Sequence, residues 1–505
     1  MLVLLVALLT GLHIYQDFGV SIDEVSQREI GYVAYMKATD TYPGEYTYKY
    51  RDHGPGFEWV YMFFEKLLHT SSFRDIFLTR HLVTYLFFVC SMAAGYTWIY
   101  RVFGSRWLAA FGLAALLFHP VIFGHAFFNP KDIPAMCMFL LAMVTAHRAF
   151  RKQKLVAYFV LGLVCGYGTT FRLMNIIVLA PIALFLLADI VSAYSQRKNA
   201  GKLILAGLLV CAGTCITLYA SWPTLWDDPI AGLQYVYETS AQYPWKGSVQ
   251  FAGQLIPATD LPWSYIPTWF SITTPELFLL LGIIGVIICI SGIIRSPGMY
   301  FRNTPLRSVL LALICFFLPL IIVIRLNAVL YDGWRHMYFI YPAFVMLAVF
   351  GLHELLKHRA KTIVWSLCAL QLVLIGVFMY RNHPFEHVYF NSFVSHEKNY
   401  LVKNYELDYW GTGHKHGLEW LAEHDERYGI KVFMDIWTLR DNYKFLDKPM
   451  HSKFILTWDI FEAEYFLEFF RTNPYQFPNK DAPESRIIYE KEVLGSPVYR
   501  IVKLR

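Results

Sequence analysis

The chain of 505 residues is poor in charge, since only 16% of its residues are Asp, Glu, Lys or Arg. A soluble globular domain carries about 25%. The deficit is concentrated in long apolar runs, and 56% of all residues are hydrophobic. These features exclude an ordinary soluble enzyme and predict a polytopic protein embedded in a lipid bilayer. The net charge of +6 lies in short basic clusters between apolar runs, so we expect no nucleic-acid partner.

The sequence also lacks a disulfide framework and a metal-ligand pattern. Its eight cysteines lie in apolar runs without a CxxC pair, which is typical of small buried hydrophobic residues. His414 and His416 form an HxH pattern, but two ligands do not make a metal site. The N-terminus lacks a basic region and a small-residue cleavage site, so we predict a first membrane span there instead of a signal peptide.

Long apolar runs predict about eleven membrane spans and therefore a helical membrane fold. The predicted spans are roughly 1–16, 80–100, 107–123, 133–149, 155–171, 173–193, 203–221, 276–294, 307–324, 336–356 and 362–380. We find no internal repeat of the kind seen in many transporters.

The connections between these spans alternate in character. One set is short and basic, and the other is longer, aromatic and mixed in charge. The positive-inside rule places the basic set in the cytoplasm. We therefore expect a multi-pass protein of the inner membrane with a cytoplasmic N-terminus and an extracytoplasmic tail. The basic connections are 101–106, 148–154, 197–202, 295–307 and 357–361, and the others are 17–79, 119–132, 222–275, 325–335 and the tail from 381.

Composition changes abruptly after residue 380, which predicts two domains, a membrane domain at 1–380 and a soluble mixed α/β domain at 381–505. In the second domain, spacing predicts helices over 417–428 and 460–471 and strands over 431–437 and 454–458. Residues 486–490 and 498–502, joined through Gly495, Ser496 and Pro497, are predicted to form a hairpin.

The adjacent carboxylates Asp23 and Glu24 follow the first apolar run. Charge inside hydrocarbon costs about 3 kcal/mol on insertion scales, so such a pair belongs at a water-facing mouth. One interpretation is a helix start, capped by Ser21 or Asp23 and favoured by Glu24. The other is a catalytic base, because transfer to a hydroxyl group needs a group that takes its proton.

The stretch from Asn129 to Asp132 lies in a short outer loop before a span, where Pro130 and Pro134 fix a turn. Lys131 and Asp132 then lie at the membrane surface, either as an ion pair of little value or as part of a shared site. His119 and His125 flank this loop without metal-ligand spacing, and we expect structural roles for both.

Arg335 and His336 open a late span from the outer side. A guanidinium at this position either grips a phosphate in bidentate fashion or is an interfacial arginine within its aromatic belt. Arg325 is a second cation on the same side, and Arg172, which interrupts the apolar run 155–193, is a third.

Two further loops could line a substrate. Residues 48–56 combine cations, His53 and a turn, and serve equally well as a plain loop. Residues 222–275 are rich in Trp, Tyr and Pro, so they could lie on the membrane interface or cover a lipid or sugar site.

Three of these features together resemble the GT-C membrane glycosyltransferases. They are the acidic pair after the first span, Asn-Pro-Lys-Asp at 129–132 and the arginine that opens a late span. The similarity is greatest to the protein O-mannosyltransferases of glycosyltransferase family 39 and to the aminoarabinose transferases. It covers roughly residues 1–380, while 382–391 and 405–411 look like the tails of uncharacterised bacterial members.

The resemblance implies a polyprenyl-phosphate-linked monosaccharide as donor and inverting transfer on the outer face. It implies a glycan, lipid or protein acceptor and no required cofactor, with a divalent metal left open. The tail is not the β-trefoil insert of the eukaryotic protein mannosyltransferases, which argues against a protein acceptor. By the resemblance Asp23 and Asp132 are catalytic, and the expected substrate-binding residues are Glu24, His53, Asn129, Lys131, Arg335 and His336.

Two other classes of function compete with this hypothesis. A transporter or lipid flippase would carry charges at mid-span or broken helices at the membrane midplane. A non-catalytic assembly protein would use the tail as its working part.

Overall fold

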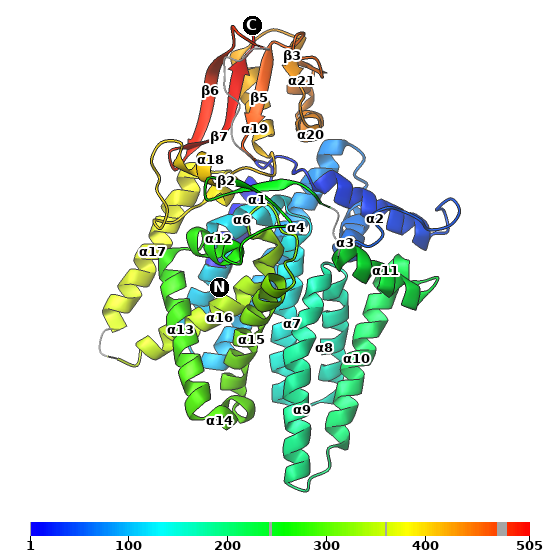
Figure 1. Ribbon diagram of the computed structural model, residues 1–505, viewed down its shortest axis with the longest axis vertical. Helices are drawn as coiled ribbons and strands as arrows, with labels where there is room; N and C mark the ends of the chain where they lie inside the picture. Colours follow the sequence, from blue (N-terminus) through cyan, green and yellow to red (C-terminus); the bar gives the residue numbers. More distant parts are fainter. Residues whose placement is uncertain (1, 242–244, 359–360, 472–481) are drawn as a thin grey trace.

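The computed structural model describes residues 2–241, 245–358, 361–471 and 482–505. A bundle of long helices carries a small α/β region on one end (Figure 1). The long helices of the bundle are α4 (Phe73–Phe103), α7 (Asp132–Lys152), α9 (Leu179–Ser195), α10 (Gly201–Ser221), α13 (Glu276–Arg295), α15 (Thr304–Arg325), α16 (Tyr341–Leu355) and α17 (Lys361–Asn382). Its shorter helices are α1 (Leu2–Ile14), α5 (Arg106–Leu117), α6 (Pro120–Phe128), α8 (Leu155–Thr169), η1 (Leu173–Val178) and η3 (Arg335–Ile340).

The predicted membrane fold is confirmed, because every predicted span is helical. Eight helices among the described residues are long and apolar enough to cross a membrane, or nine if α5 and α6, bent by 60°, form one span. The predicted count of about eleven is therefore too high for full-length spans. The helix α8 has 15 residues. At about 1.5 Å per residue, it does not reach across a hydrocarbon core of about 30 Å.

Two of the five predicted basic connections lie at one end of the bundle and the aromatic connections at the other, while the predicted connection 357–361 includes residues 359–360, which lie outside the described residues. The basic stretches at 197–202 and 295–307, the latter containing α14 (Pro297–Arg302), lie at the end away from the sheet (Figure 1). The aromatic connections lie at the other end, beside the tail. Their elements are α2 (Glu24–Ala38), α3 (Gly56–Leu67), η2 (Pro223–Leu225), α11 (Pro229–Ala241), β1 (Ser248–Phe251), β2 (Gln254–Pro257) and α12 (Tyr265–Thr273).

The helices α8 and α10 pack against each other through small residues. A Cβ on Gly162 would lie 2.3 Å from the Val210 carbonyl oxygen, and one on Gly166 would lie 2.2 Å from that of Thr214. Such small-xxx-small spacing allows close approach of membrane helices. The α8 helix ends at Thr169, three residues before Arg172, which reaches the site described below.

The tail contains the predicted mixed α/β structure. Its elements are η4 (Glu386–Val388), α18 (Tyr400–Asn404), α19 (Gly413–His424), β3 (Ile430–Phe433), α20 (Trp437–Phe445), α21 (Lys448–His451), β4 (Phe454–Thr457), β5 (Tyr465–Phe469), β6 (Arg486–Val493) and β7 (Ser496–Lys503). They form one sheet in the order β4-β3-β5-β7-β6, in which β3 is parallel to β4 and β5.

Most of the elements predicted in the tail are confirmed, including the hairpin of β6 and β7. The predicted helix over 460–471 is wrong, since Tyr465–Phe469 form the central strand β5. Four of the five residues of β5 are buried. A short, mostly apolar stretch fits a buried strand as well as it fits a helix, so spacing alone misassigned it.

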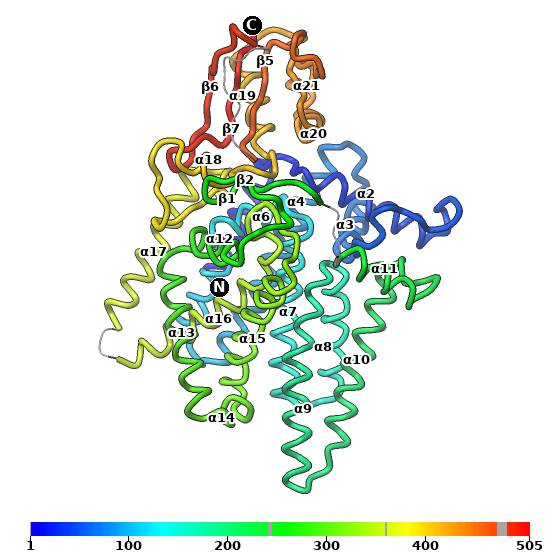
Figure 2. The backbone as a smooth tube through the Cα atoms, in the orientation of Figure 1, coloured from blue at the N-terminus to red at the C-terminus, as the bar shows by residue number. Residues whose placement is uncertain are grey.

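The tail is tied to the first loop of the chain rather than only to α17. Asn442 of α20 donates from Nδ2 to the Val20 carbonyl and accepts from the Val20 N–H, each at 2.9 Å. In the same way, the hairpin of β1 and β2 contacts the tail, because Gln250 donates to the Val402 carbonyl at 2.9 Å. Figure 2 shows the first loop running beneath the tail. These contacts hold residues 19–23 and 402–411 over one end of the bundle.

Candidate functional site

The centre of the site is Arg335, a buried side chain at the start of η3. Its Nη1 lies 3.0 Å from Oδ2 of Asp23 and 3.4 Å from Oδ2 of Asp132, and its Nη2 lies 3.0 Å from Oδ2 of Asp332. The guanidinium also packs against the rings of Tyr331 and Trp410, at 4.9 and 4.6 Å. One cation thus joins three carboxylates from three distant parts of the chain.

The turn before η3 aims Asp332 at this guanidinium. Asp332 and Gly333 both have left-handed backbone conformations, with φ of 58° and 67°. Such a conformation is costly for a residue with a Cβ and is often found where function requires it. The carboxylate of Asp332 is buried and is shared with Arg471 of the tail, whose Nη2 lies 2.8 Å from Oδ1.

Asp132 begins α7 and is held in place by the preceding loop, which starts at Asn129. Asn129 ends α6, accepts from the Asp132 N–H at 2.8 Å and donates to Oδ2 of Asp132 at 3.0 Å. Arg172, at the break between α8 and η1, pairs with Oδ1. Asp132 is 1% exposed and is therefore shielded from bulk water. Its ion pairs hold Arg172 and Arg335 in place.

Asp23 lies at the start of α2, but its side chain makes no capping hydrogen bond. The helix-start interpretation instead applies to Glu24, which accepts from the Ser21 N–H at 2.7 Å and pairs with His81 at 3.1 Å. Glu24 is buried, whereas the Asp23 side chain is 33% exposed. The two adjacent carboxylates therefore point into different surroundings, and the sequence-based placement of Glu24 in the substrate site does not match its position.

A cavity of about 380 Å³ opens beside Arg335. The predicted residues Asp23, His53, Lys131, Arg335 and His336 all line it, as does Arg172. Asp132 supports two of the lining arginines from behind. Asn129 is buried and supports Asp132, so it does not line the cavity.

Two titratable groups that line the cavity have shifted pKa values. Burial, followed by the nearby Arg172 charge, lowers the pKa of Lys131 to about 8. Burial, together with the charge of Lys131, lowers the pKa of His53, whose Nδ1 lies 3.0 Å from Oδ2 of Asp52. Lys131 is therefore mainly cationic at neutral pH and loses its charge in mildly alkaline solution, while His53 favours its neutral form.

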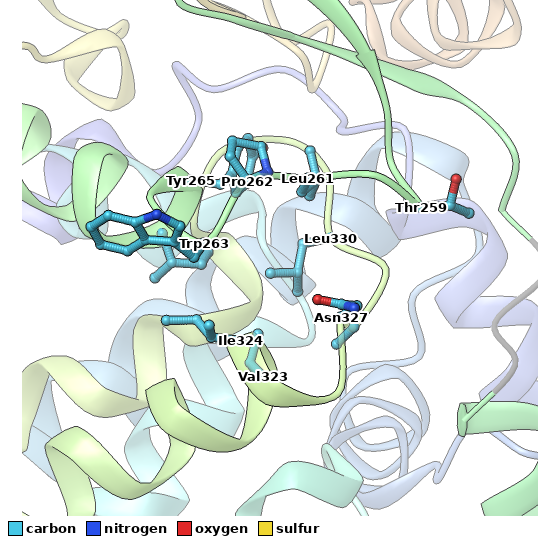
Figure 3. Close-up of a pocket in the computed structure, with 11 residues that line it drawn as sticks. Thr259, Leu261, Pro262, Trp263, Tyr265, Val323, Ile324, Asn327 and Leu330 are labelled. Carbon is cyan, nitrogen blue, oxygen red and sulfur yellow. The ribbon is translucent and has the colours of Figure 1, made fainter.

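A small apolar crevice of about 30 Å³ adjoins the cavity (Figure 3). Leu261, Pro262 and Trp263 lie on one side of it, with the C-terminal end of α15 opposite. Val323 and Leu330 line both the crevice and the cavity. The cavity, with its charged lining, is therefore continuous with a small apolar surface.

Several residues at the site were not assigned from the sequence. Arg172 was predicted only as a cation on the outer side. Asp332 lies three residues before Arg335, and the turn-like Asp332-Gly333 pair was the signal that could have identified it. Trp410 and Arg471 gave no such signal, because they come from a tail that only folding brings to the site. Arg325 is exposed and does not line the cavity. Among the described residues, no group of His, Cys, Asp and Glu side chains is arranged to hold a metal ion.

Residues 52–217 match the family model of dolichyl-phosphate-mannose-protein mannosyltransferase. The predicted resemblance is confirmed. The matched range contains Asp132, Arg172 and the Asn-Pro-Lys-Asp loop. No curated protein matches the chain.

Two solved structures are similar at a distance. The oligosaccharyltransferase of Archaeoglobus fulgidus in the apo form gives a TM-score of 0.47 at 10% identity, covering 91% of this chain and 65% of that one. ArnT from Cupriavidus metallidurans bound to undecaprenyl phosphate gives 0.47 at 11% identity, covering 89% and 75%. The chain thus spans 65% of the length of the oligosaccharyltransferase.

Proposed function

We propose that this protein is a membrane glycosyltransferase that moves a monosaccharide from a polyprenyl-phosphate donor to an acceptor hydroxyl with inversion. The observation that carries the proposal is the cavity that brings the exposed Asp23 together with Arg335, Arg172 and Lys131. Such a displacement needs a base to take the proton of the acceptor hydroxyl and cations to stabilise the leaving phosphate. The family match over 52–217 supports the same reaction class.

Asp23 is the proposed base. Of the three carboxylates on Arg335, Asp132 also pairs with Arg172 and Asp332 also pairs with Arg471. Asp23 is the most exposed of the three and, among the described residues, pairs with Arg335 alone. Its carboxylate takes the proton of the acceptor hydroxyl while the acceptor oxygen forms a bond to the anomeric carbon.

In the same displacement the bond between the anomeric carbon and the phosphate oxygen breaks, and the lipid phosphate leaves with the electron pair. Arg172 and Lys131 lie on the cavity wall, where they can stabilise the added negative charge together with Arg335. In this scheme Asp132 acts by holding the two arginines, whereas the sequence predicted a catalytic residue that positions the acceptor or donor.

The apolar side chains Val323 and Leu330, which line both the cavity and the crevice, are suited to contact the start of the donor's isoprenoid chain. The positive-inside rule puts the basic end of the bundle in the cytoplasm. The cavity and the tail then face the extracytoplasmic side of an inner membrane, where a glycan or lipid acceptor meets the donor. A transporter or flippase is less well supported, because the candidate residues gather at one end of the bundle and not at mid-span.

The test is transfer of radiolabelled sugar from a panel of polyprenyl-phosphate sugars by purified protein in detergent. We expect at least one donor to give transfer that is lost in Asp23→Asn. Absence of transfer from every donor to glycan, lipid and peptide acceptors would refute the proposal.

A further inference from the structure

The tail reaches the site through Trp410, a fully buried side chain in the loop between α18 and α19. Its ring packs on the Arg335 guanidinium at 4.6 Å. Its carbonyl accepts from the Ile22 N–H at 3.1 Å, one residue before Asp23. One residue of the tail therefore contacts the Arg335 side chain and the backbone immediately before Asp23.

Trp410 also contacts the support of Asp132. Its Nε1 lies 3.3 Å from Nε2 of His125, and Nδ1 of His125 lies 3.1 Å from Nδ2 of Asn129. Asn129 in turn donates to Asp132 at 3.0 Å. These contacts close a ring that runs from Trp410 through His125, Asn129, Asp132 and Arg335 back to Trp410.

A second tail residue acts on the opposite arm of the guanidinium. Arg471 follows β5 and pairs with Asp332, which holds Nη2 of Arg335. Glu406, four residues before Trp410, is buried beside this pair, and its Oε2 accepts from the Gly333 N–H at 3.4 Å. Residues of the tail thus contact groups that hold or adjoin Asp23, Asp132 and Asp332, the three carboxylates that pair with Arg335.

We propose that Trp410 and Arg471 are positioning residues that set the orientation of Arg335 toward Asp23 and the cavity. The tail is then a structural part of the transferase site and not an independent domain. The kinetic part of this inference rests on the proposed function. Its physical basis is that both residues restrict the position of the Arg335 guanidinium. Catalysis depends on how such a group is oriented toward the reacting atoms, and a shift of about 1 Å can lower the rate about 100-fold.

The variants for the test are Trp410→Phe and Trp410→Ala, with Trp420→Ala as matched control. Trp420 also belongs to the tail, but it stacks on His424 and Tyr489, at 3.9 and 4.7 Å. We expect Trp410→Ala to lower kcat about 10- to 100-fold with the acceptor KM nearly unchanged. Trp410→Phe, which keeps a ring on Arg335, should recover most of the rate. Equal loss of kcat in Trp410→Ala and Trp420→Ala would overturn the inference.

A double-mutant cycle separates this inference from the proposed reaction and remains informative if Trp410→Ala does not fold. The cycle combines Trp410→Phe with Arg335→Lys and measures the thermal unfolding midpoint. We expect non-additive shifts, since the two side chains are in contact. Trp420→Ala with Arg335→Lys should be additive. Additive shifts in both cycles would refute the positioning role, whereas a wild-type protein without transfer refutes only the proposed function.

Discussion

Two buried arginines of this protein have almost the same surroundings, and only one of them lies at the candidate site. Arg80 of α4 pairs with Glu58 at 2.7 Å and with Glu65 at 3.1 Å, and it packs on the ring of Tyr61 at 3.8 Å. Arg335 likewise pairs with carboxylates and packs on aromatic rings. In both arginines Nε lacks a hydrogen-bond partner among the described residues.

The difference lies in the carboxylates and not in the arginines. The side chains of Glu58 and Glu65 are 5% and 7% exposed, whereas that of Asp23 is 33% exposed on a cavity wall. A buried pair cannot exchange its partner without leaving a charge in low dielectric. The Arg80 cluster is therefore suited to holding α3 against α4, and the Arg335 cluster is suited to meeting a ligand.

The sharpest test of this distinction is Asp23→Asn. Loss of the base should reduce sugar transfer about 100- to 10,000-fold, while the thermal unfolding midpoint changes little, since Arg335 keeps Asp132 and Asp332. The measurements are radiolabelled transfer and thermal unfolding on the same preparation. Full activity in this variant would remove Asp23 from its proposed role.

Arg335→Lys is expected to have the next largest effect on transfer. Lysine keeps the charge but loses the planar fork that joins several carboxylates, so we expect kcat to fall about 100-fold, with donor use most affected. Steady-state kinetics with donor and acceptor varied separately measure both effects. Arg325→Lys is the matched control on the same side of the membrane, and an equal loss there would contradict the assignment.

Glu58→Gln tests whether the Arg80 cluster serves stability and not sugar transfer. Removing one partner of a buried ion pair costs about 3–5 kcal/mol, so this variant should unfold at a clearly lower temperature. Its transfer per folded molecule should stay within about twofold of wild type at low temperature. A strong loss of kcat without loss of stability would show that the two clusters are not functionally distinct.

The smallest expected effect is a pH dependence from Lys131. Its pKa is lowered to about 8 by burial and by Arg172, so its charge is present below that pH and is lost above it. Donor binding should weaken several-fold between about pH 7 and 9, because a neutral amine stabilises phosphate poorly. Lys131→Arg should move this loss to higher pH. Identical donor KM profiles for the two proteins would rule out Lys131 as the titrating group.

The sequence predicted the parts of the site that are local. Asn129, Lys131 and Asp132 lie together in one loop, and Arg335 begins a span, so position relative to the apolar runs identified them. It placed both Asp23 and Glu24 in the site, because the sequence does not show which way adjacent side chains at a helix start point. The backbone of α2 turns one toward the cavity and the other toward Ser21 and His81.

Composition alone determined that the chain crosses a membrane and that the ionisable residues gather at the ends of its helices, because hydrocarbon penalises charge wherever it occurs. Tertiary structure decided which of those residues meet. Arg335 and Asp23 are 312 positions apart, and Trp410 and Arg471 come from a region of different composition. Their contacts depend on how α2, η3 and the tail pack over one end of the bundle, and no local pattern encodes that arrangement.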